Sequence, residues 1–289
     1  LFMDNEKIGH RGEAYLLLLA SLLGMNLMAA SADLVMLYLA IETTSIPLYV
    51  LSGFMLADNK STESGFKYLL FGAMASAIML YGFSLLFGFT GTTNLYQLAD
   101  MLQNGSLSLT TAFGLLALIL VGLGFKVSIV PFHFWAPDVY EGAPTPVSGF
   151  LSTASKAAGF AVLVRLFFVA FPGLAESWTL VLAILSAVTM TVGNLLTLQQ
   201  TNIKRLLAYS SVAHAGYTLI GVVALTQLGA ASVVFYLAAY IATNLLAFGI
   251  VMAFSRVTGL DDIKDYAGLS RRSPLLGLMM LAAFLSLAG

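Results

Sequence analysis

Long apolar windows separated by short polar stretches form the dominant pattern along this 289-residue chain. A helix needs about 20 apolar residues to cross a bilayer. Windows of that length predict eight transmembrane helices, at 14–31, 33–56, 65–89, 111–140, 148–170, 178–198, 204–225 and 230–255. A ninth apolar window begins at about 275, and the two longest polar stretches, 90–110 and 256–274, are predicted to be loops. The pattern therefore predicts an all-α polytopic membrane protein, with residues 1–289 forming a single transmembrane helical domain.

Composition supports a lipid environment. Hydrophobic residues make up 59% of the chain and charged residues 9%, whereas soluble domains have about 45–50% apolar and about 25% charged residues. The chain has no cysteine, which excludes disulfides, thiolate zinc sites and cysteine-ligated iron–sulfur clusters. The sequence also shows no nucleotide-binding fingerprint and no signal-peptide pattern. We therefore predict no metal and no cofactor bound by this chain, the lipid bilayer as a partner, and no nucleic-acid partner.

The basic residues are distributed asymmetrically between the predicted loops. If the helices alternate in direction, nine of the thirteen lysines and arginines lie on one side of the membrane, namely Lys7, Arg11, Lys60, Lys204, Arg205, Arg256, Lys264, Arg271 and Arg272. The loops on the opposite side carry none. The positive-inside rule then places the first side in the cytoplasm.

The other four basic residues, Lys67, Lys126, Lys156 and Arg165, lie within the predicted spans, and Glu42 joins them. A charge near the bilayer centre costs about 2.5–3.5 kcal/mol on insertion scales, so these residues are candidates for function. Lys67 and Arg165 lie near span ends, where a long side chain can reach the interface. For Arg165, this interfacial interpretation is favoured over a functional one. For Lys67, the two interpretations are equally favoured. For Glu42, the alternative is a structural ion pair with one of the lysines.

The stretch "GFKVSIVPFHFWAPDVYEGAPTPV" at 124–147 holds four of the seven prolines, a lysine, a histidine and two acids. Proline lacks the backbone donor that a continuous helix requires. Gly122 and Gly124 precede Lys126, and Pro131 follows it, so the sequence predicts a broken helix near 126–131. Broken backbone inside a membrane is tolerated where it is buried in protein or lines a cavity. The freed carbonyl groups, with water, are expected to solvate the Lys126 ammonium.

These residue types suit proton transfer. Burial weakens the hold of a lysine on its proton, and a nearby carboxylate strengthens it. We therefore predict that Glu42 and Lys126 form a switchable pair, that Lys156 receives the proton, and that His133 or His214 relays it. Two alternatives stay open, since His133 is equally compatible with an interfacial position and His214 with a packing role.

Two segments resemble a known family. "GFKVSIVPFHFWAPDVYEGAPTPVSGFLSTASKAAGFAVLVR" and "NIKRLLAYSSVAHAGY" are similar to the signature segments of the antiporter-like membrane subunits of respiratory complex I, and the wording is most similar to the subunit N family. The resemblance implies two inverted five-helix repeats, each with a broken helix, at 14–170 and, truncated, at 178–289. It also implies that the chain is the central part of a longer protein.

The resemblance further implies a function. It implies a non-redox, proton-translocating membrane subunit of a NADH:quinone oxidoreductase, a translocase of the bacterial inner (plasma) membrane. Its partners would be other membrane-arm subunits, including neighbouring antiporter-like subunits, while NADH, FMN, iron–sulfur clusters and quinone would bind elsewhere in the complex. The alternatives are a Mrp-type cation/proton antiporter subunit and a non-transporting membrane scaffold. The residues that match the ionisable positions of the family are Glu42, Lys67, Lys126, Lys156, His133 and His214.

Overall fold

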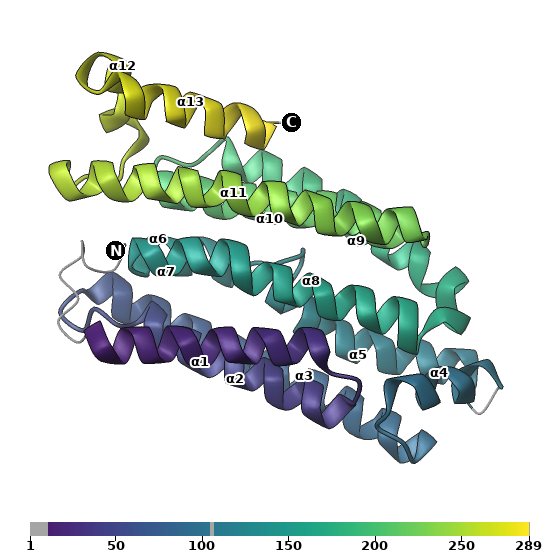
Figure 1. Ribbon diagram of the computed structural model, residues 1–289. Helices are drawn as coiled ribbons and strands as arrows, with labels where there is room; N and C mark the ends of the chain where they lie inside the picture. The colour runs from purple at the N-terminus through teal and green to yellow at the C-terminus, as the bar shows by residue number, and fades with distance from the viewer. Residues whose placement is uncertain (1–10, 105–106, 289) are drawn as a thin grey trace.

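The computed structural model describes residues 11–104 and 107–288, which form a bundle of long helices (Figure 1). Eight helical spans in this part are long and apolar enough to cross a membrane. The continuous ones are α1 (Arg11–Ala30), α2 (Leu34–Ser52), α3 (Asn59–Thr90), α5 (Leu109–Val127), α9 (Ala175–Thr197), α10 (Ile203–Val223) and α11 (Gln227–Thr258). The ninth predicted window forms α13 (Pro274–Ala288). The structure confirms a polytopic all-α membrane protein.

The remaining span, Thr145–Ala170, is not a uniform α-helix. It consists of α7 (Thr145–Phe150), a π-helical segment (Leu151–Ser155), α8 (Lys156–Arg165) and a second π-helical segment (Leu166–Ala170). A π-helical turn widens the helix locally, and such turns are frequent at functional sites. The first one ends directly before Lys156, a feature that the sequence pattern did not predict.

The helix break predicted near 126–131 is confirmed. α5 ends at Val127, and Ser128 has left-handed backbone angles (φ 61°, ψ 41°). Residues 128–134 form turns, and the chain resumes as α6 (Trp135–Gly142). The predicted window at 111–140 is therefore two helices joined by a turn.

Two predicted loops contain short helices. Within 90–110, α4 (Leu95–Gln103) begins after Asn94, whose side-chain oxygen accepts hydrogen bonds from the backbone N–H groups of Tyr96 (3.0 Å) and Gln97 (3.3 Å). Within 256–274 lie a 3₁₀ turn (Ile263–Tyr266) and α12 (Leu269–Arg272). The polar residues of 90–110 indicated a loop, but asparagine at this position is a helix N-cap.

The same local architecture occurs twice. In the first half, Asp33 before α2 pairs through an isolated bridge with Asn94, which lies beyond the 32-residue helix α3. In the second half, Asn202 before α10 pairs in the same way with Asp262, beyond the 32-residue helix α11. Both long helices end at a left-handed glycine, Gly91 or Gly259. This repetition supports the antiporter-like repeat fold, while the exact limits 14–170 and 178–289 stay predictions.

The ends of the bundle differ in charge as the loop pattern predicted. Figure 1 shows the start of α1 and the helix α12 at one end, with α4 at the other. Lys60, Arg205 and Lys264 lie at element boundaries on the first end, which we call the basic end. The helix faces that point outward carry many exposed leucine and phenylalanine side chains, as expected of surfaces that contact lipid.

Candidate functional site

Lys126 lies in the last turn of α5, beside the break, and is only 4% exposed. Its ammonium donates a hydrogen bond to the Ser45 hydroxyl of α2 (2.9 Å). The expected solvation by freed carbonyl groups is not what the structure shows. The Phe125 carbonyl accepts from the Ser128 N–H (3.1 Å) and the Trp135 indole (3.0 Å). The prediction that Lys126 is enclosed by protein is confirmed, but its hydrogen-bond partner is a serine.

Glu42 lies on α2, three residues before Ser45, and therefore on the same face of that helix. It is half-buried, and its carboxylate accepts a hydrogen bond from the Ser76 hydroxyl of α3. Glu42 interacts electrostatically with Lys126, but none of the ion pairs within 4.0 Å joins these two described residues. The structure therefore shows each of the two side chains bound to a serine hydroxyl of a neighbouring helix.

Lys156 is 2% exposed and begins α8, directly after the π-helical segment. Its ammonium donates to the backbone carbonyl of Ser211 (2.6 Å) and to the Ser211 hydroxyl, both on α10. The Tyr140 hydroxyl of α6 lies 3.5 Å from the same serine hydroxyl. A buried ammonium requires such acceptors, because desolvation of an unpaired charge costs several kcal/mol.

The neighbourhoods of the two buried lysines are contiguous. Gly159, one turn after Lys156 on α8, packs directly against α5. A Cβ atom at Gly159 would lie 2.7 Å from the Val127 side chain and 3.3 Å from Cγ of Lys126. Only a residue without a side chain permits this close approach. The helix that carries Lys156 is thus in contact with the stem of Lys126.

His214 lies on α10, three residues after Ser211, and is 7% exposed. Its Nδ1 atom is 2.5 Å from the Tyr236 hydroxyl of α11. The rings of Tyr217 and Tyr240 also surround it, at centroid distances of 5.5 and 4.9 Å. His214 interacts electrostatically with Lys156. A packing role and a relay role are both consistent with this arrangement.

His133 lies in the turn between α5 and α6 and is 4% exposed. Its ring packs on Phe134 (4.6 Å between centroids), and Tyr209 of α10 lies 6.5 Å away. Its Nδ1 atom has no hydrogen-bond partner among residues 11–104 and 107–288. Like His214, His133 interacts electrostatically with Lys156. His133 is therefore buried within the protein, and its interfacial and relay interpretations both stay open.

Lys67 belongs to a different cluster, at the basic end. Its ammonium lies 2.6 Å from Asp138 of α6 and 2.7 Å from Glu63, and its side chain is 33% exposed. We call this group the interface cluster; its six charged residues line a cavity of about 130 Å³ and are Lys60, Glu63, Lys67, Asp138, Glu141 and Arg205. The interfacial alternative for Lys67 thus agrees with its partly exposed position in this cluster.

The interface cluster explains the two acids in the proline-rich stretch. Asp138 and Glu141, three residues apart on α6, both accept hydrogen bonds from Arg205 of α10, at 2.6 and 3.0 Å. Glu141 also pairs with Lys60 of α3 at 2.8 Å. The cluster therefore ties α6, which follows the break, to α3 and α10. Sequence reasoning missed these partners, although the i, i+3 spacing of the acids indicated a shared helix face.

Arg165, the other basic residue near a span end, donates a hydrogen bond to the backbone carbonyl of Ala29 (2.6 Å). Ala29 lies in the last turn of α1, where carbonyl groups lack helical partners. The favoured interpretation of Arg165 as a residue at the end of the bundle agrees with this contact.

The structure therefore places four of the predicted site residues on neighbouring helices of the bundle. They are Glu42 on α2, Lys126 on α5, Lys156 on α8 and His214 on α10. Lys67 lies apart from them, in the interface cluster. Within residues 11–104 and 107–288, no group of three or more histidine or acidic side chains is placed to hold a metal ion.

Replacing Glu141 with glutamine should test the interface cluster. Burial raises the pKa of Glu141, but hydrogen bonds from Lys60 and Arg205 outweigh it and hold the pKa below its ordinary value. A carboxyl group whose pKa is lower in the folded than in the unfolded state stabilises the fold at pH values above its unfolded-state pKa, which is about 4.3 for glutamate. This stabilisation is lost as the pH falls through the folded-state pKa. We therefore expect Glu141→Gln to lower the free energy of unfolding by about 1 kcal/mol at pH 7. This difference from the wild type should shrink toward zero below about pH 4.

Thermal unfolding of the purified full-length protein at the two pH values measures this difference. The matched control is Asp100→Asn, which neutralises an exposed acid on α4 at the opposite end. An equal destabilisation by Glu141→Gln at both pH values would contradict an electrostatic role for the cluster.

Comparison with known proteins identifies the family. Residues 31–289 match the family model described as NADH:quinone oxidoreductase/Mrp antiporter, TM. The chain belongs to this antiporter family. Among curated members, it is 51% identical over 285 residues to "NADH-quinone oxidoreductase subunit N" of Moorella thermoacetica, covering 98% of this chain and 60% of that protein. A subunit N from Heliobacterium modesticaldum is 50% identical over 279 residues, covering 96% of this chain and 58% of that protein.

Solved structures of antiporter-family subunits share the fold. A chain of respiratory complex I from Thermus thermophilus with bound Aureothin superimposes with a TM-score of 0.79 at 40% identity, covering 95% of this chain and 59% of that chain. A chain of the Mrp complex from Dietzia sp. superimposes with a TM-score of 0.84 at 26% identity, covering 94% of this chain and 51% of that chain. The sequence resemblance is thus confirmed. The chain spans about 60% of the length of the curated relatives that it matches.

Proposed function

We propose that this chain is the proton-translocating core of a membrane subunit of a NADH:quinone oxidoreductase. The observation that carries the proposal is the pair of buried lysines. Lys126 and Lys156 lie on adjoining helices, and each ammonium is held by a serine of a neighbouring helix, Ser45 or Ser211. Charges inside a membrane are costly and mark ion or proton pathways.

The proposed mechanism alternates the charge of Lys126. When Glu42 approaches, the carboxylate stabilises the ammonium and Lys126 keeps its proton. When Glu42 is held by Ser76, as in the structure, the buried ammonium loses that stabilisation and releases its proton toward Lys156. The Ser45 hydroxyl accepts from Lys126 in the structure, and a hydroxyl both donates and accepts. Moving one charge against 100 mV requires about 2.3 kcal/mol, which is within the range of one close charge–charge contact.

Lys156 is the proposed acceptor and distributor of this proton. Its own partner, Ser211, is also near the Tyr140 hydroxyl, and both His133 and His214 interact with its charge. A proton that reaches Lys156 therefore has two histidines as candidate relays, toward α6 or toward the second half of the bundle.

The relatives support quinone oxidoreductase over the Mrp-type alternative. Proteins named NADH-quinone oxidoreductase subunit N are about 50% identical to this chain, whereas the Mrp structure is 26% identical. We propose that NADH, FMN, iron–sulfur clusters and quinone bind to other subunits of the complex. The proposed partners are other membrane-arm subunits, including antiporter-like neighbours, in a bacterial inner membrane.

Isolation of the tagged full-length protein from its native membrane tests this proposal. Co-isolation of flavin and iron–sulfur subunits, with NADH-driven proton uptake in inverted vesicles that persists without sodium, is the expected result. Isolation with only other antiporter-like chains, together with sodium-dependent proton movement and no NADH oxidation, would instead establish the Mrp-type function.

A further inference from the structure

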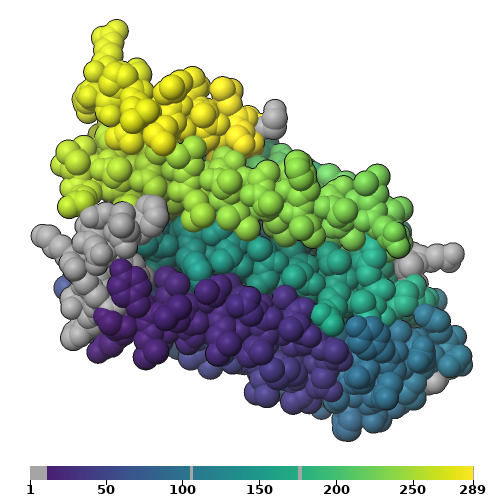
Figure 2. Space-filling model, in the orientation of Figure 1, coloured from purple at the N-terminus to yellow at the C-terminus, as the bar shows by residue number. Residues whose placement is uncertain are grey.

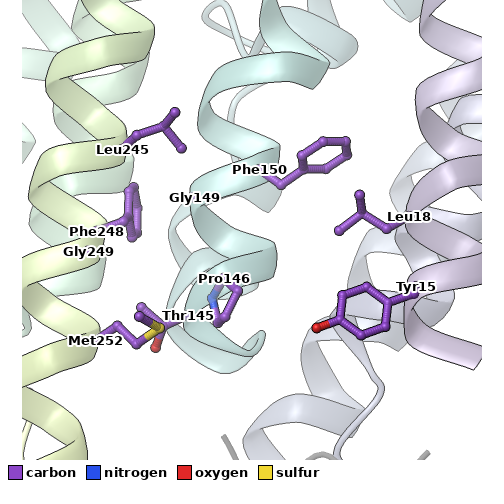
Figure 3. A pocket seen from close by; sticks show the side chains of 10 residues that line it. All are labelled: Tyr15, Leu18, Thr145, Pro146, Gly149, Phe150, Leu245, Phe248, Gly249 and Met252. Carbon is purple, nitrogen blue, oxygen red and sulfur yellow. The ribbon is translucent and has the colours of Figure 1, made fainter. Parts of the chain in front are cut away.

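An apolar groove runs along the membrane-spanning part of the bundle, between α1 and α11 (Figure 3). Its volume is about 270 Å³, and α7 forms its floor, where Pro146 and Gly149 lie. Leu245 and Phe248 of α11 form one wall, and Leu18 and Tyr15 of α1 form the other. In the space-filling view, α7 and α8 appear between the purple surface of α1 and the light green surface of α11 (Figure 2).

A polar cavity of about 520 Å³ adjoins this groove at the basic end of the bundle. The two share Thr145 and Met252. The charged residues of the polar cavity have both signs and are Asp58, Lys204, Arg256 and Asp261. The groove and the cavity together thus form one continuous amphipathic site, which we call the α1–α11 site.

Lys204 is the feature of the polar cavity that points to a ligand. Its side chain is only 10% exposed, and the ion pair that it forms among residues 11–104 and 107–288, with Asp261, is long at 3.4 Å. The other oxygen of that carboxylate accepts a hydrogen bond from Ser255. An ammonium has three donors, and a buried charge is stable only when it is well paired. Lys204 therefore has donor capacity left for an anionic group in the cavity.

An acceptor for a cation is available in the same cavity. One oxygen of Asp58 accepts the backbone N–H of Lys60 at 2.9 Å, and the carboxylate is exposed. A ligand that matches both Lys204 and Asp58 carries a negative and a positive group close together. The adjoining groove requires an apolar tail, and the polar end faces the side of the membrane on which the basic loops lie.

We propose that the α1–α11 site binds one phosphatidylethanolamine molecule of that leaflet. One acyl chain lies in the groove over Gly149, the phosphate accepts from Lys204, and the primary ammonium donates to Asp58. Phosphatidylcholine lacks N–H donors for Asp58, and phosphatidylglycerol brings no cation to it. A helix of another chain is about 10–12 Å wide and offers no phosphate to Lys204. This inference is independent of whether the protein moves protons.

The test uses the full-length protein within its complex. Native mass spectrometry after detergent washing reports the lipids that remain bound, and refilling in nanodiscs of phosphatidylethanolamine, phosphatidylcholine or phosphatidylglycerol reports the headgroup preference. We expect one phosphatidylethanolamine retained by the wild type. Lys204→Gln should reduce its retention about tenfold, because it removes a hydrogen bond to a charged group. Leu245→Trp should exclude it by filling the groove.

Two matched controls separate the site from general effects. Lys264→Gln removes an exposed cation on the same end of the bundle, and Leu278→Trp enlarges an exposed side chain on α13. Both should retain the lipid. Equal lipid retention in all four variants, preference for phosphatidylglycerol or phosphatidylcholine, or a protein segment seated in the groove of the full-length complex would overturn the proposal.

Discussion

Replacing Lys126 with alanine is expected to reduce proton pumping and coupled quinone reduction by about tenfold or more, the scale on which loss of a proton-transfer group acts. The complex should still assemble. The partner of Lys126 in the structure is the neutral hydroxyl of Ser45, and Glu42 keeps its own hydrogen bond from Ser76. Removing the ammonium therefore leaves no strongly buried unpaired charge, which is the usual cause of severe destabilisation.

Two further variants distinguish a switching charge from a fixed one. Lys126→Arg should not restore full activity, since a guanidinium remains protonated in proteins. Glu42→Gln should also impair pumping, because an amide does not stabilise the ammonium as a carboxylate does. Lys264→Ala, which removes an exposed cation, serves as the control. Proton uptake is measured with quinone reductase activity in membranes of verified assembly. Wild-type pumping in both Lys126→Ala and Glu42→Gln would establish the scaffold alternative.

Much of the fold follows from local sequence signals. Apolar windows are sufficient to locate membrane spans because lipid cannot satisfy exposed backbone groups. The break after Lys126 was predictable because Gly122, Gly124 and Pro131 weaken the same turns of helix. α4 was not, because the polar residues of 90–110 resemble those of a loop. The π-helical segment before Lys156 also left no clear local signal, since it depends on packing against neighbouring helices.

The candidate site was predictable where burial is costly. Lys126 and Lys156 stood out because lysine deep in an apolar segment has few structural reasons to be there. Their serine partners did not stand out. Serine is inexpensive inside a membrane helix, where its hydroxyl bonds to the preceding turn, as Ser45 also does to the Ile41 carbonyl. Which serine meets a lysine depends on how helices distant in sequence are packed.

Lys67 shows the limit of the same argument. The free-energy cost of placing the Lys67 charge inside a membrane span suggested a role in proton transfer, and the family resemblance reinforced that expectation. Glu63 lies one turn earlier on the same helix, but the ion pair with Asp138 was not predictable, because Asp138 comes from α6, which is distant in sequence. Lys67 lies near the start of the 65–89 window, whereas Lys126 and Lys156 lie deeper in theirs, and this position near a span end left the interfacial and proton-transfer interpretations of Lys67 evenly matched.

Replacing Lys156 with alanine is expected to impair pumping about as severely as Lys126→Ala, because the path between the two halves then has no group to accept the proton. Ser211→Ala tests the contact that holds this lysine. It removes the hydroxyl acceptor but leaves the Ser211 carbonyl, to which the ammonium also donates at 2.6 Å. We therefore expect an intermediate loss of pumping, with about 1.5 kcal/mol or more of lost stabilisation for a hydrogen bond to a charged group.

Ser211→Thr and Ser152→Ala complete this test. Threonine keeps the hydroxyl, so Ser211→Thr should pump like the wild type. If Ser211 had a purely structural role, the added methyl group in this fully packed position should instead impair the variant. Ser152 is equally buried, but its hydroxyl bonds only to the Gly149 carbonyl of its own helix (2.9 Å), so its loss should leave pumping intact. Proton uptake is compared with quinone reductase activity in each variant after assembly is verified. If Ser211→Ala pumps like Ser152→Ala, the serine hydroxyl merely packs beside Lys156, and the proton leaves this lysine through the histidines without it.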